Sequence, residues 1–206
     1  MLIDSSDLHL VLPQDFSAAV EVQVSAFLSD PLWVYLFTDS GRRERTARQT
    51  FSAALRFALL NGQLHGTGHP PEGIAIWSVP DQKTRLRAVL GSGFWRLFFS
   101  PFILQVQRVI PVFSQFERMH KQYAAKPHYY LNTISVRPAA QGKGLASKLI
   151  RPFLARADVE GVGCYTETMT PSNVGLYQHF GFKVMEDYSV PNTDLHIWSL
   201  YRPFRG

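Results

Sequence analysis

The segment that most constrains the fold of this chain runs from Val136 to Ala146 and reads Val-Arg-Pro-Ala-Ala-Gln-Gly-Lys-Gly-Leu-Ala. The pattern predicts the end of a strand, a loop with two glycines, and the beginning of a helix. A helix N-terminus after such a loop presents unpaired backbone N–H groups, which attract phosphate. Gly142 and Gly144 also remove side chains where the backbone must approach a ligand closely. The segment therefore predicts a site for a phosphorylated ligand.

Two common phosphate sites do not fit this loop. A Walker loop needs four residues between its glycines and then Gly-Lys-Ser/Thr, and this pattern is absent. A dinucleotide-binding fingerprint needs a third glycine where Ser147 stands. It also needs an acidic residue about 20 positions further on, whereas Asp158 and Glu160 come too early.

The loop resembles the Gln/Arg-x-x-Gly-x-Gly/Ala signature of the GNAT superfamily of N-acetyltransferases, here Gln141-x-x-Gly144-x-Ala146. Further motifs follow in the family's order, and within the superfamily the chain looks like the puromycin N-acetyltransferase-like group. Specific motifs cover about a third of the chain, and the first half matches only loosely. The further motifs are His128-Tyr129-Tyr130-Leu131, Ile134-Ser135-Val136-Arg137-Pro138, Tyr165-Thr166-Glu167-Thr168, Asn173-x-x-Leu176-Tyr177 and Gly181-Phe182-Lys183-Val184.

The resemblance implies that acetyl-CoA is the cosubstrate and lies where two parallel strands, His128–Val136 and Gly163–Thr168, splay apart. The free strand backbone would pair with the amide-bearing pantetheine arm, as a sheet edge pairs with a peptide, and could also supply the oxyanion donor. The pyrophosphate would rest on the glycine loop. The cofactor-binding residues implied are Ile134, Ser135, Val136, Gln141, Gly142, Lys143, Gly144, Leu145, Ala146, Ser147, Asn173 and Tyr177.

Tyr177 and Glu167 are the candidate catalytic residues. Tyr177 lies one helical turn after Asn173, and the resemblance implies that this side of the helix faces the thioester sulfur, where the hydroxyl would protonate the departing thiolate. Without the resemblance, Tyr177 reads as a packed aromatic residue. Strand alternation places Glu167 with Tyr165 and opposite Cys164. Glu167 could take the amine proton, bind the substrate ammonium, or cap a helix.

Cys164 is the only cysteine in the chain, so an internal disulfide framework is excluded and a reducing compartment is expected. It opens an apolar strand and has no obvious base beside it. We expect a small buried filler, and therefore direct transfer without an acetyl-enzyme.

The chain is expected to form one domain, residues 1–206, with a cofactor core at about 128–190 and acceptor-side helices at about 14–125. The order of elements predicts an α/β (α+β) fold with a mixed, mostly antiparallel central sheet, a splayed parallel strand pair and flanking helices. The expected strands are 8–12, 73–79, 128–136, 163–168, 182–190 and 195–201. The expected helices are 14–28, 42–60, 83–125 with a break at Ser100-Pro101, 144–158 and 171–180.

Two aromatic groups and a histidine pair allow more than one interpretation. Phe94, Trp95, Phe98, Phe99 and Phe102 fall on one broad helical face, and we expect core packing there, with a pocket wall or a homodimer interface as the alternative. Trp33, Tyr35 and Phe37 would line the acceptor pocket or pack in the core. His65-x3-His69 has metal-ligand spacing, but the glycines and prolines around it predict an exposed turn and no metal site.

The formal charge of +5 indicates an acidic partner. A phosphorylated cofactor fits better than nucleic acid, because basic and aromatic residues are not interleaved. The apolar stretch Phe94–Phe113 contains Arg96, Arg108 and two prolines, so it is not a spanning helix, and no membrane partner is expected. Met1-Leu2-Ile3-Asp4 lacks the pattern of a secretory signal, which predicts a cytoplasmic protein.

Two functions remain open after this reading. The first is an enzyme that moves an acetyl group from acetyl-CoA to a primary amine of a small molecule or peptide. The second is a non-catalytic acyl-CoA-binding sensor on the same fold. Glu167 and Tyr177 favour the enzyme, because a sensor needs neither residue.

Overall fold

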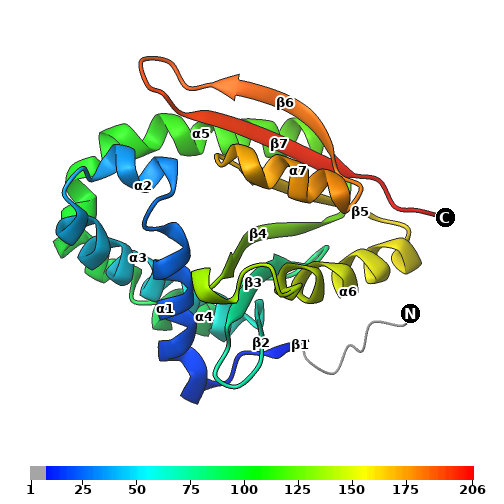
Figure 1. Ribbon diagram of the computed structural model, residues 1–206, viewed down its shortest axis with the longest axis horizontal. Helices are drawn as coiled ribbons and strands as arrows, with labels where there is room; N and C mark the ends of the chain where they lie inside the picture. The colour runs from blue at the N-terminus through cyan, green and yellow to red at the C-terminus, as the bar shows by residue number, and fades with distance from the viewer. Residues whose placement is uncertain (1–7) are drawn as a thin grey trace.

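The computed structural model describes residues 8–206, which form a mixed sheet flanked by helices (Figure 1). The sheet order is β1-β2-β3-β4-β5-β7-β6, and the β4–β5 pair is parallel whereas the other neighbouring pairs are antiparallel. The predicted fold class is confirmed. The absence of a secretory signal, expected from residues 1–4, concerns a part of the chain outside the described residues. The strands are β1 (Leu8–Leu10), β2 (Leu64–Thr67), β3 (Gly73–Ser78), β4 (His128–Val136), β5 (Gly163–Thr168), β6 (Lys183–Ser189) and β7 (His196–Arg202).

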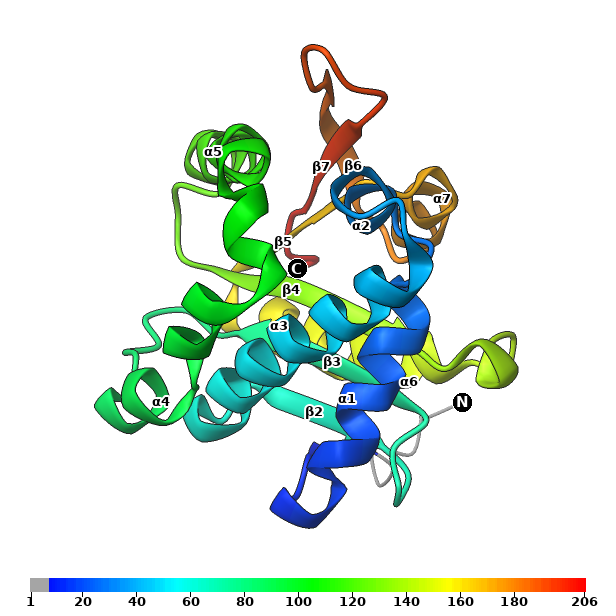
Figure 2. The same cartoon turned by 90° about the vertical axis from the view of Figure 1, so that its left-hand side faces the viewer.

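Helices cover both faces of this sheet (Figures 1 and 2). Two of them, α6 and α7, pack on one face in a core that includes Trp77, whose ring stacks on Phe153 of α6. The helices α1, α3 and α5 pack on the opposite face. The α-helices are α1 (Phe16–Phe27), α2 (Pro31–Leu36), α3 (Ser40–Asn61), α4 (Leu86–Gly91), α5 (Val106–Tyr123), α6 (Leu145–Glu160) and α7 (Pro171–His179). The 3₁₀ helices are η2 (Pro13–Asp15), η3 (Phe94–Phe99), η4 (Pro101–Gln105) and η5 (Pro138–Ala140).

The parallel pair β4–β5 separates partway along its length. Pairing runs from His128 opposite Gly163 to Leu131 opposite Thr166 and then ends. Strand β4 continues to Val136 with only β3 as its neighbour, and β5 stays paired with β7. The two strands diverge in Figure 1, so one edge of β4 from Asn132 onward has no strand partner.

Several ends of helices and strands lie where local sequence patterns predicted them. Both β4 and β5 begin and end at the predicted residues. Helix α3 ends at Gly62, which adopts the left-handed conformation that glycine allows (φ 75°). The Ser100 side chain accepts a hydrogen bond from the Phe102 backbone N–H and separates η3 from η4, as the Ser100-Pro101 pair predicted.

One prediction about the first half of the chain was wrong, and the short helix after Asp30-Pro31 was not predicted. His65 lies in β2 rather than in an exposed turn, because Gly66 and Thr67 pair with β3 and β1 on either side. Its ring packs against Phe153, and burial lowers the pKa of His65. The Asp30-Pro31 break is followed by the short helix α2, whose first turn is capped by the Asp30 carboxylate.

The segment from α4 to α5 runs along one side of the molecule (Figure 2), from beside α3 to beside β7. No single helix among residues 8–206 is long and apolar enough to cross a membrane. The stretches Leu86–Phe99 and Pro101–Tyr123 reach that length and composition only together, and they are bent by 73° at Ser100.

Candidate active site

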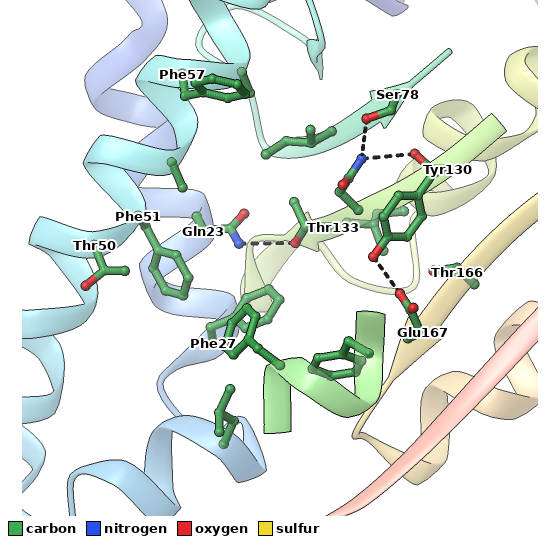
Figure 3. Close-up of a pocket in the computed structure, with 18 of the residues that line it drawn as sticks. Gln23, Phe27, Thr50, Phe51, Phe57, Ser78, Tyr130, Thr133, Thr166 and Glu167 are labelled. Atoms are coloured by element: carbon green, nitrogen blue, oxygen red, sulfur yellow. Dashed lines mark hydrogen bonds between the residues drawn. The ribbon is translucent and has the colours of Figure 1, made fainter. Parts of the chain in front are cut away.

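A cavity of about 930 Å³ lies on the α1, α3 and α5 side of the sheet, beside the point where β4 and β5 separate. We call this cavity the chamber, and Figure 3 shows part of its lining. The walls that come from α1, α2, α3 and the segment from η3 to α5 are mostly apolar and carry many aromatic side chains. The aromatic lining residues on these elements are Phe27, Trp33, Phe51, Phe57, Phe94, Phe102, Phe113 and Phe116.

Glu167 faces the chamber from β5 and meets Tyr130 of β4 (Figure 3). The Tyr130 hydroxyl donates a hydrogen bond to Glu167 Oε2 over 2.6 Å. Within the described residues Glu167 Oε1 is buried and makes no hydrogen bond. Burial raises the pKa of this carboxyl from its ordinary value to about 7, although the hydrogen bond from Tyr130 opposes the rise. A carboxyl with this pKa and an oxygen that lacks a hydrogen-bond partner is suited to accept a proton from a ligand near neutral pH.

Tyr177 and Asn173 reach the same chamber from α7. Tyr177 is buried, and burial raises the pKa of its hydroxyl to about 12, while a hydrogen bond with Thr166 lowers it. The Thr166 hydroxyl in turn donates to the Leu131 carbonyl over 3.0 Å, at the last paired position of β4 and β5. Tyr177 therefore lies beside the last paired position of β4 and β5. The hydroxyl keeps its proton at neutral pH.

The chamber is lined by acidic rather than basic residues, although the chain has a formal charge of +5, and one of the acidic residues, Glu117, forms an ion pair with Lys121 over 2.8 Å. Three carboxyl groups line it, from Asp30, Glu117 and Glu167, and no lysine or arginine among the described residues does. His120 also lines it, and burial, together with the neighbouring His128, lowers the pKa of His120, which favours the neutral ring. The lining therefore favours a cationic ligand.

Two histidines close one side of the chamber. His120 Nε2 lies 2.7 Å from His128 Nε2, so one ring donates a hydrogen bond to the other when at most one ring is charged. The His120 ring also stacks on Tyr165. The sequence did not place either histidine, because α5 and β4 meet only in the folded chain.

The glycine loop has the conformation of an anion site. Gly142 and Gly144 both have φ 77°, and a Cβ at either position would meet no atom within 4 Å. Gly144 caps α6 without a side-chain hydrogen bond, and no acidic residue stands in the first turn of α6. The first N–H groups of α6 therefore remain available at the positive end of the helix. Gln141, Lys143 and both glycines are exposed.

The free edge of β4 supplies backbone groups beside this loop. Ile134, Ser135 and Val136 pair with β3 on one side and have no strand on the other. The Ser135 hydroxyl donates to Gln23 Oε1 over 2.8 Å, and the Gln23 amide donates to Thr133 over 3.2 Å. The Ser135 side chain therefore links β4 to α1. The backbone groups of Ser135 on the unpaired edge of β4 remain available to a ligand.

Cys164 lies away from these groups. Its side chain is buried in the core beneath α6, on the face of β5 opposite Glu167. Burial raises the pKa of the thiol to about 12. A thiol in this state is a poor nucleophile.

The structure places four of the predicted site residues in the chamber, and the others lie at the end of β4 and in the loop and first turn of α6 that follow it. Glu167, Asn173, Tyr177 and Ile134 line one cavity, and the loop Gln141–Ser147 follows the end of β4. Trp33 lines the chamber, as one of the two interpretations of that residue expected, whereas Tyr35 and Phe37 do not. The sequence missed Tyr130, His120 and Gln23. One pattern in the sequence could have indicated Tyr130. Successive side chains of a strand point to opposite faces of the sheet, so Tyr130 and Leu131 of β4 lie on different faces.

Comparisons with known proteins agree with this architecture. The family model of the acetyltransferase (GNAT) domain matches residues 104–184. An uncharacterized N-acetyltransferase of Schizosaccharomyces pombe is 27% identical over 183 residues, which cover 82% of this chain and 71% of the relative. Among solved structures, a protein from Corynebacterium glutamicum titled as histone acetyltransferase HPA2 and related acetyltransferase has a TM-score of 0.67 at 20% identity, with 97% of each chain covered. A polyamine N-acetyltransferase of Drosophila melanogaster has a TM-score of 0.63 at 11% identity, with 96% of this chain and 99% of that chain covered.

The fold, the glycine loop and these matches define an acetyl-CoA-dependent N-acetyltransferase. Residues 104–184 match the acetyltransferase (GNAT) domain, and the chain as a whole has the fold of the GNAT structures it resembles. The finer assignment to the puromycin N-acetyltransferase-like group stays a prediction.

The glycine loop generates the first test. Acetyl-CoA at about 100 times its Kd should raise Tm by about 5–10 °C, through its linkage to the folded state. Gly144→Val should abolish this rise, because a side chain at this position occupies the space over the α6 N-terminus. The measurement is thermal unfolding with and without acetyl-CoA.

Gly161→Val is the matched control for this substitution. Gly161 caps the other end of α6 with φ 67°, and a Cβ there also meets no atom within 4 Å. Both variants should therefore lose about 1–2 kcal/mol from backbone strain alone. Gly161→Val should keep the rise in Tm, and an undiminished rise in Gly144→Val would exclude the loop as the pyrophosphate site.

The raised pKa of Glu167 predicts a pH-dependent stability. The carboxyl has an ordinary pKa of 4.5 and a folded-state pKa of about 7, so ionising it costs folding free energy, and stability falls as pH rises from about 4.5 to about 7. The cost above pH 7 is about 3 kcal/mol. Glu167→Gln cannot ionise and keeps an acceptor for Tyr130. It should raise the free energy of unfolding at pH 8 by about 1–3 kcal/mol, and by much less at pH 5, in chemical denaturation.

Glu186→Gln is the control of opposite sign. A hydrogen bond from Arg118, supported by Tyr123, lowers the pKa of Glu186. Removing this carboxylate should therefore destabilise the fold at pH 8 and matter less as pH falls through the folded pKa. An equal gain for Glu167→Gln at pH 5 and pH 8 would contradict the raised pKa.

Proposed function

We propose that the chain acetylates a primary amine that has an apolar body, by direct attack on acetyl-CoA in a ternary complex. The observation that carries the proposal is the lining of the chamber, which combines aromatic walls with three carboxyl groups and, in the part of the chain described, no lysine or arginine. An ammonium group is attracted to the carboxyl end, and an apolar body is stabilised against the walls. Small-molecule amines fit this enclosure, and a peptide terminus with an apolar first residue also carries the required groups.

Acetyl-CoA supplies an acetyl group activated as a thioester. The residues that would hold it are the free backbone of Ile134, Ser135 and Val136, and the amides from Gly142 to Ser147 with Gln141 before them. Lys143 would add positive charge near the phosphates, and Asn173 and Tyr177 would face the thioester end. The unpaired strand edge and the uncapped helix N-terminus support this assignment.

Glu167 would accept the proton of the attacking amine, directly or through water. Its pKa of about 7 leaves a large fraction ionised near neutral pH, and its buried Oε1 has no hydrogen-bond partner among the described residues. As the new N–C bond forms, the C–S bond breaks, and the thiolate takes a proton from the Tyr177 hydroxyl. The raised pKa of Tyr177, about 12, keeps this proton in place before transfer. Binding of the substrate ammonium by Glu167 is compatible with the same position.

Direct transfer is supported by the position of Cys164. This thiol lies on the far face of β5 from the chamber and has a pKa of about 12. A covalent acetyl-cysteine would require the strand to turn over, whereas an amine in the chamber can reach the strand opening directly.

The proposed domain organisation separates the residues that would bind the cofactor from those that would surround the acceptor. We propose a single domain in which residues of about 128–190 hold the cofactor and helices between about 14 and 125 surround the acceptor. The chamber walls from α1, α2, α3 and α5 support the second half of this statement. A cytoplasmic location and a homodimer stay predictions.

A series of n-alkylamines tests the acceptor class. These amines have the same head group, so only the apolar body changes between ethylamine and octylamine. Each added methylene buried in the chamber is worth about 0.8 kcal/mol, and kcat/KM should therefore rise roughly fourfold per methylene until the chamber is full. The measurement is the rate of acetylated product formation at subsaturating amine.

Replacing one of two alanines by phenylalanine provides a matched pair of variants for this series. Ala54 lines the chamber and Ala155 is exposed on α6, so Ala54→Phe should move the optimum to shorter amines and Ala155→Phe should not. A preference for short or multiply charged amines would refute the apolar acceptor. Acetyl-CoA binding without acetylation of any primary amine would instead favour the acyl-CoA sensor.

Tyr177→Phe tests the proposed acid, because it keeps the ring and its packing but removes the proton. The single-turnover rate should fall by roughly 10²–10⁴-fold with acetyl-CoA affinity nearly unchanged, since the interaction is used only in the transition state. Single-turnover measurement is needed because release of CoA can limit kcat. Tyr129→Phe is the control: burial also raises the pKa of Tyr129 to about 12, but its hydroxyl bonds Glu160 away from the chamber. Wild-type rates in Tyr177→Phe would remove Tyr177 from the mechanism.

A further inference from the structure

The outer side of the segment from α4 to α5 exposes an unusual amount of apolar surface. Of eighteen large apolar side chains exposed within residues 8–206, eleven lie between Leu86 and Phe113, and nine of these do not line the chamber. Phe98 and Phe99 are 69% and 84% exposed, and Trp95 is 59% exposed. We call the outer surface of residues 82–116 the apolar face. Exposed apolar side chains gathered in one segment in this number indicate a site of contact with another apolar body.

The segment that bears the apolar face also accounts for the whole net charge of the chain. Residues 82–116 contain five basic residues, Lys83, Arg85, Arg87, Arg96 and Arg108, and no aspartate or glutamate. All five are exposed. Because the formal charge of the whole chain is +5, the remaining residues are balanced. The partner of this face must therefore be apolar and negatively charged at once.

A second cavity lies within this region. It has a volume of about 640 Å³ and is lined by Arg48, Arg56 and Arg96, the backbone turn Gly91–Gly93, and the side chains of Trp95 and Phe99. Arg48 is paired with Glu21 and Glu44. Arg56 lies over Phe16 and Arg96 over Trp95, contacts that leave their charge unneutralised. We call this second cavity the groove. No carboxylate within the described chain lines it, so the groove is suited to bind a phosphate group.

We propose that the apolar face docks on an anionic lipid surface, with Trp95, Phe98 and Phe99 in the interface and a lipid phosphate in the groove of Arg56 and Arg96. Charge complementarity selects this partner. A second copy of the chain, placed on the same face by a two-fold axis, would bring five cations against five cations with no compensating carboxylate. Nucleic acid supplies phosphate but offers no apolar layer for the exposed side chains.

The shape of the segment agrees with docking rather than spanning. Leu86–Phe99 and Pro101–Tyr123 reach the length and apolar composition of a membrane-spanning helix only when they are taken together. The two parts are, however, bent by 73° relative to one another. The other side of the segment lines the chamber through Phe94, Leu97 and Phe102, so it cannot leave the domain without opening that cavity. The expectation of no membrane partner rested on the absence of a spanning helix, and it does not apply to a surface that lies in the interface.

Vesicle sedimentation of the full chain tests this proposal. We expect binding to vesicles of phosphatidylcholine with about 30% phosphatidylglycerol at 0.1 M NaCl, weak binding to phosphatidylcholine alone, and loss of binding at 0.5 M NaCl. Phe98→Ser combined with Phe99→Ser should raise the lipid concentration for half binding by roughly tenfold or more. Arg56→Gln combined with Arg96→Gln should raise it by about tenfold.

Matched variants elsewhere keep the test sharp. Val159→Ser with Phe204→Ser removes two exposed apolar side chains, and Arg42→Gln with Arg45→Gln removes two exposed charges on α3. Both pairs should leave vesicle binding within twofold of wild type, with all variants showing wild-type thermal unfolding.

Several results would overturn the proposal. They are equal binding to both kinds of vesicle, no binding to the anionic vesicles at 0.1 M NaCl, and binding that the Phe98 and Phe99 substitutions do not change. A dimer in light scattering that these two substitutions disperse would show that a second copy covers the face. Saturable binding of glycerol 3-phosphate with no retention on vesicles would show a soluble phosphate site instead.

Discussion

The separation of β4 from β5 after Leu131 and Thr166 is the constraint on which the site depends. Strand pairing on both sides would bury the β4 edge, fill the opening and leave no place for a ligand backbone. The Thr166 hydroxyl satisfies the Leu131 carbonyl at the last paired position, so the ladder can end there without an unpaired polar group. The same threonine also holds the hydroxyl of Tyr177. One residue, Thr166, therefore lies both at the end of the ladder and beside the candidate acid.

The sequence predicted the cofactor half of the molecule well because its signals are local. The glycines at 142, 144 and 62 adopt left-handed backbone, and Ser100 caps a helix, so each sets a boundary by itself. Strand β2 was missed because it is only four residues long and contains Gly66, and its pairing with β1 and β3 is not visible in the sequence. The contact between Tyr130 and Glu167 joins residues 37 positions apart, and no spacing rule predicts it.

The aromatic segment shows how a change of helix type changes which residues face out. An α-helix would have placed Phe94, Trp95, Phe98 and Phe99 together on a broad face, and core packing was expected for them. Residues 94–99 instead form a 3₁₀ helix with three residues per turn. Phe94 and Leu97 then turn to the chamber, whereas Trp95 and Phe98 turn outward. The prediction of core packing was wrong for Trp95, Phe98 and Phe99. It assumed the 3.6 residues per turn of an α-helix, whereas a 3₁₀ helix has three.

The burial of Cys164 has a practical consequence at the bench. The chain has no other cysteine, and this thiol is fully buried with a pKa of about 12. Chromogenic disulfide reagents react with thiolates, so the folded protein should contribute almost no background colour even at enzyme concentrations comparable to those of the substrate. Colour development by the protein itself would then report unfolding, and one reagent could follow both turnover and the integrity of the fold.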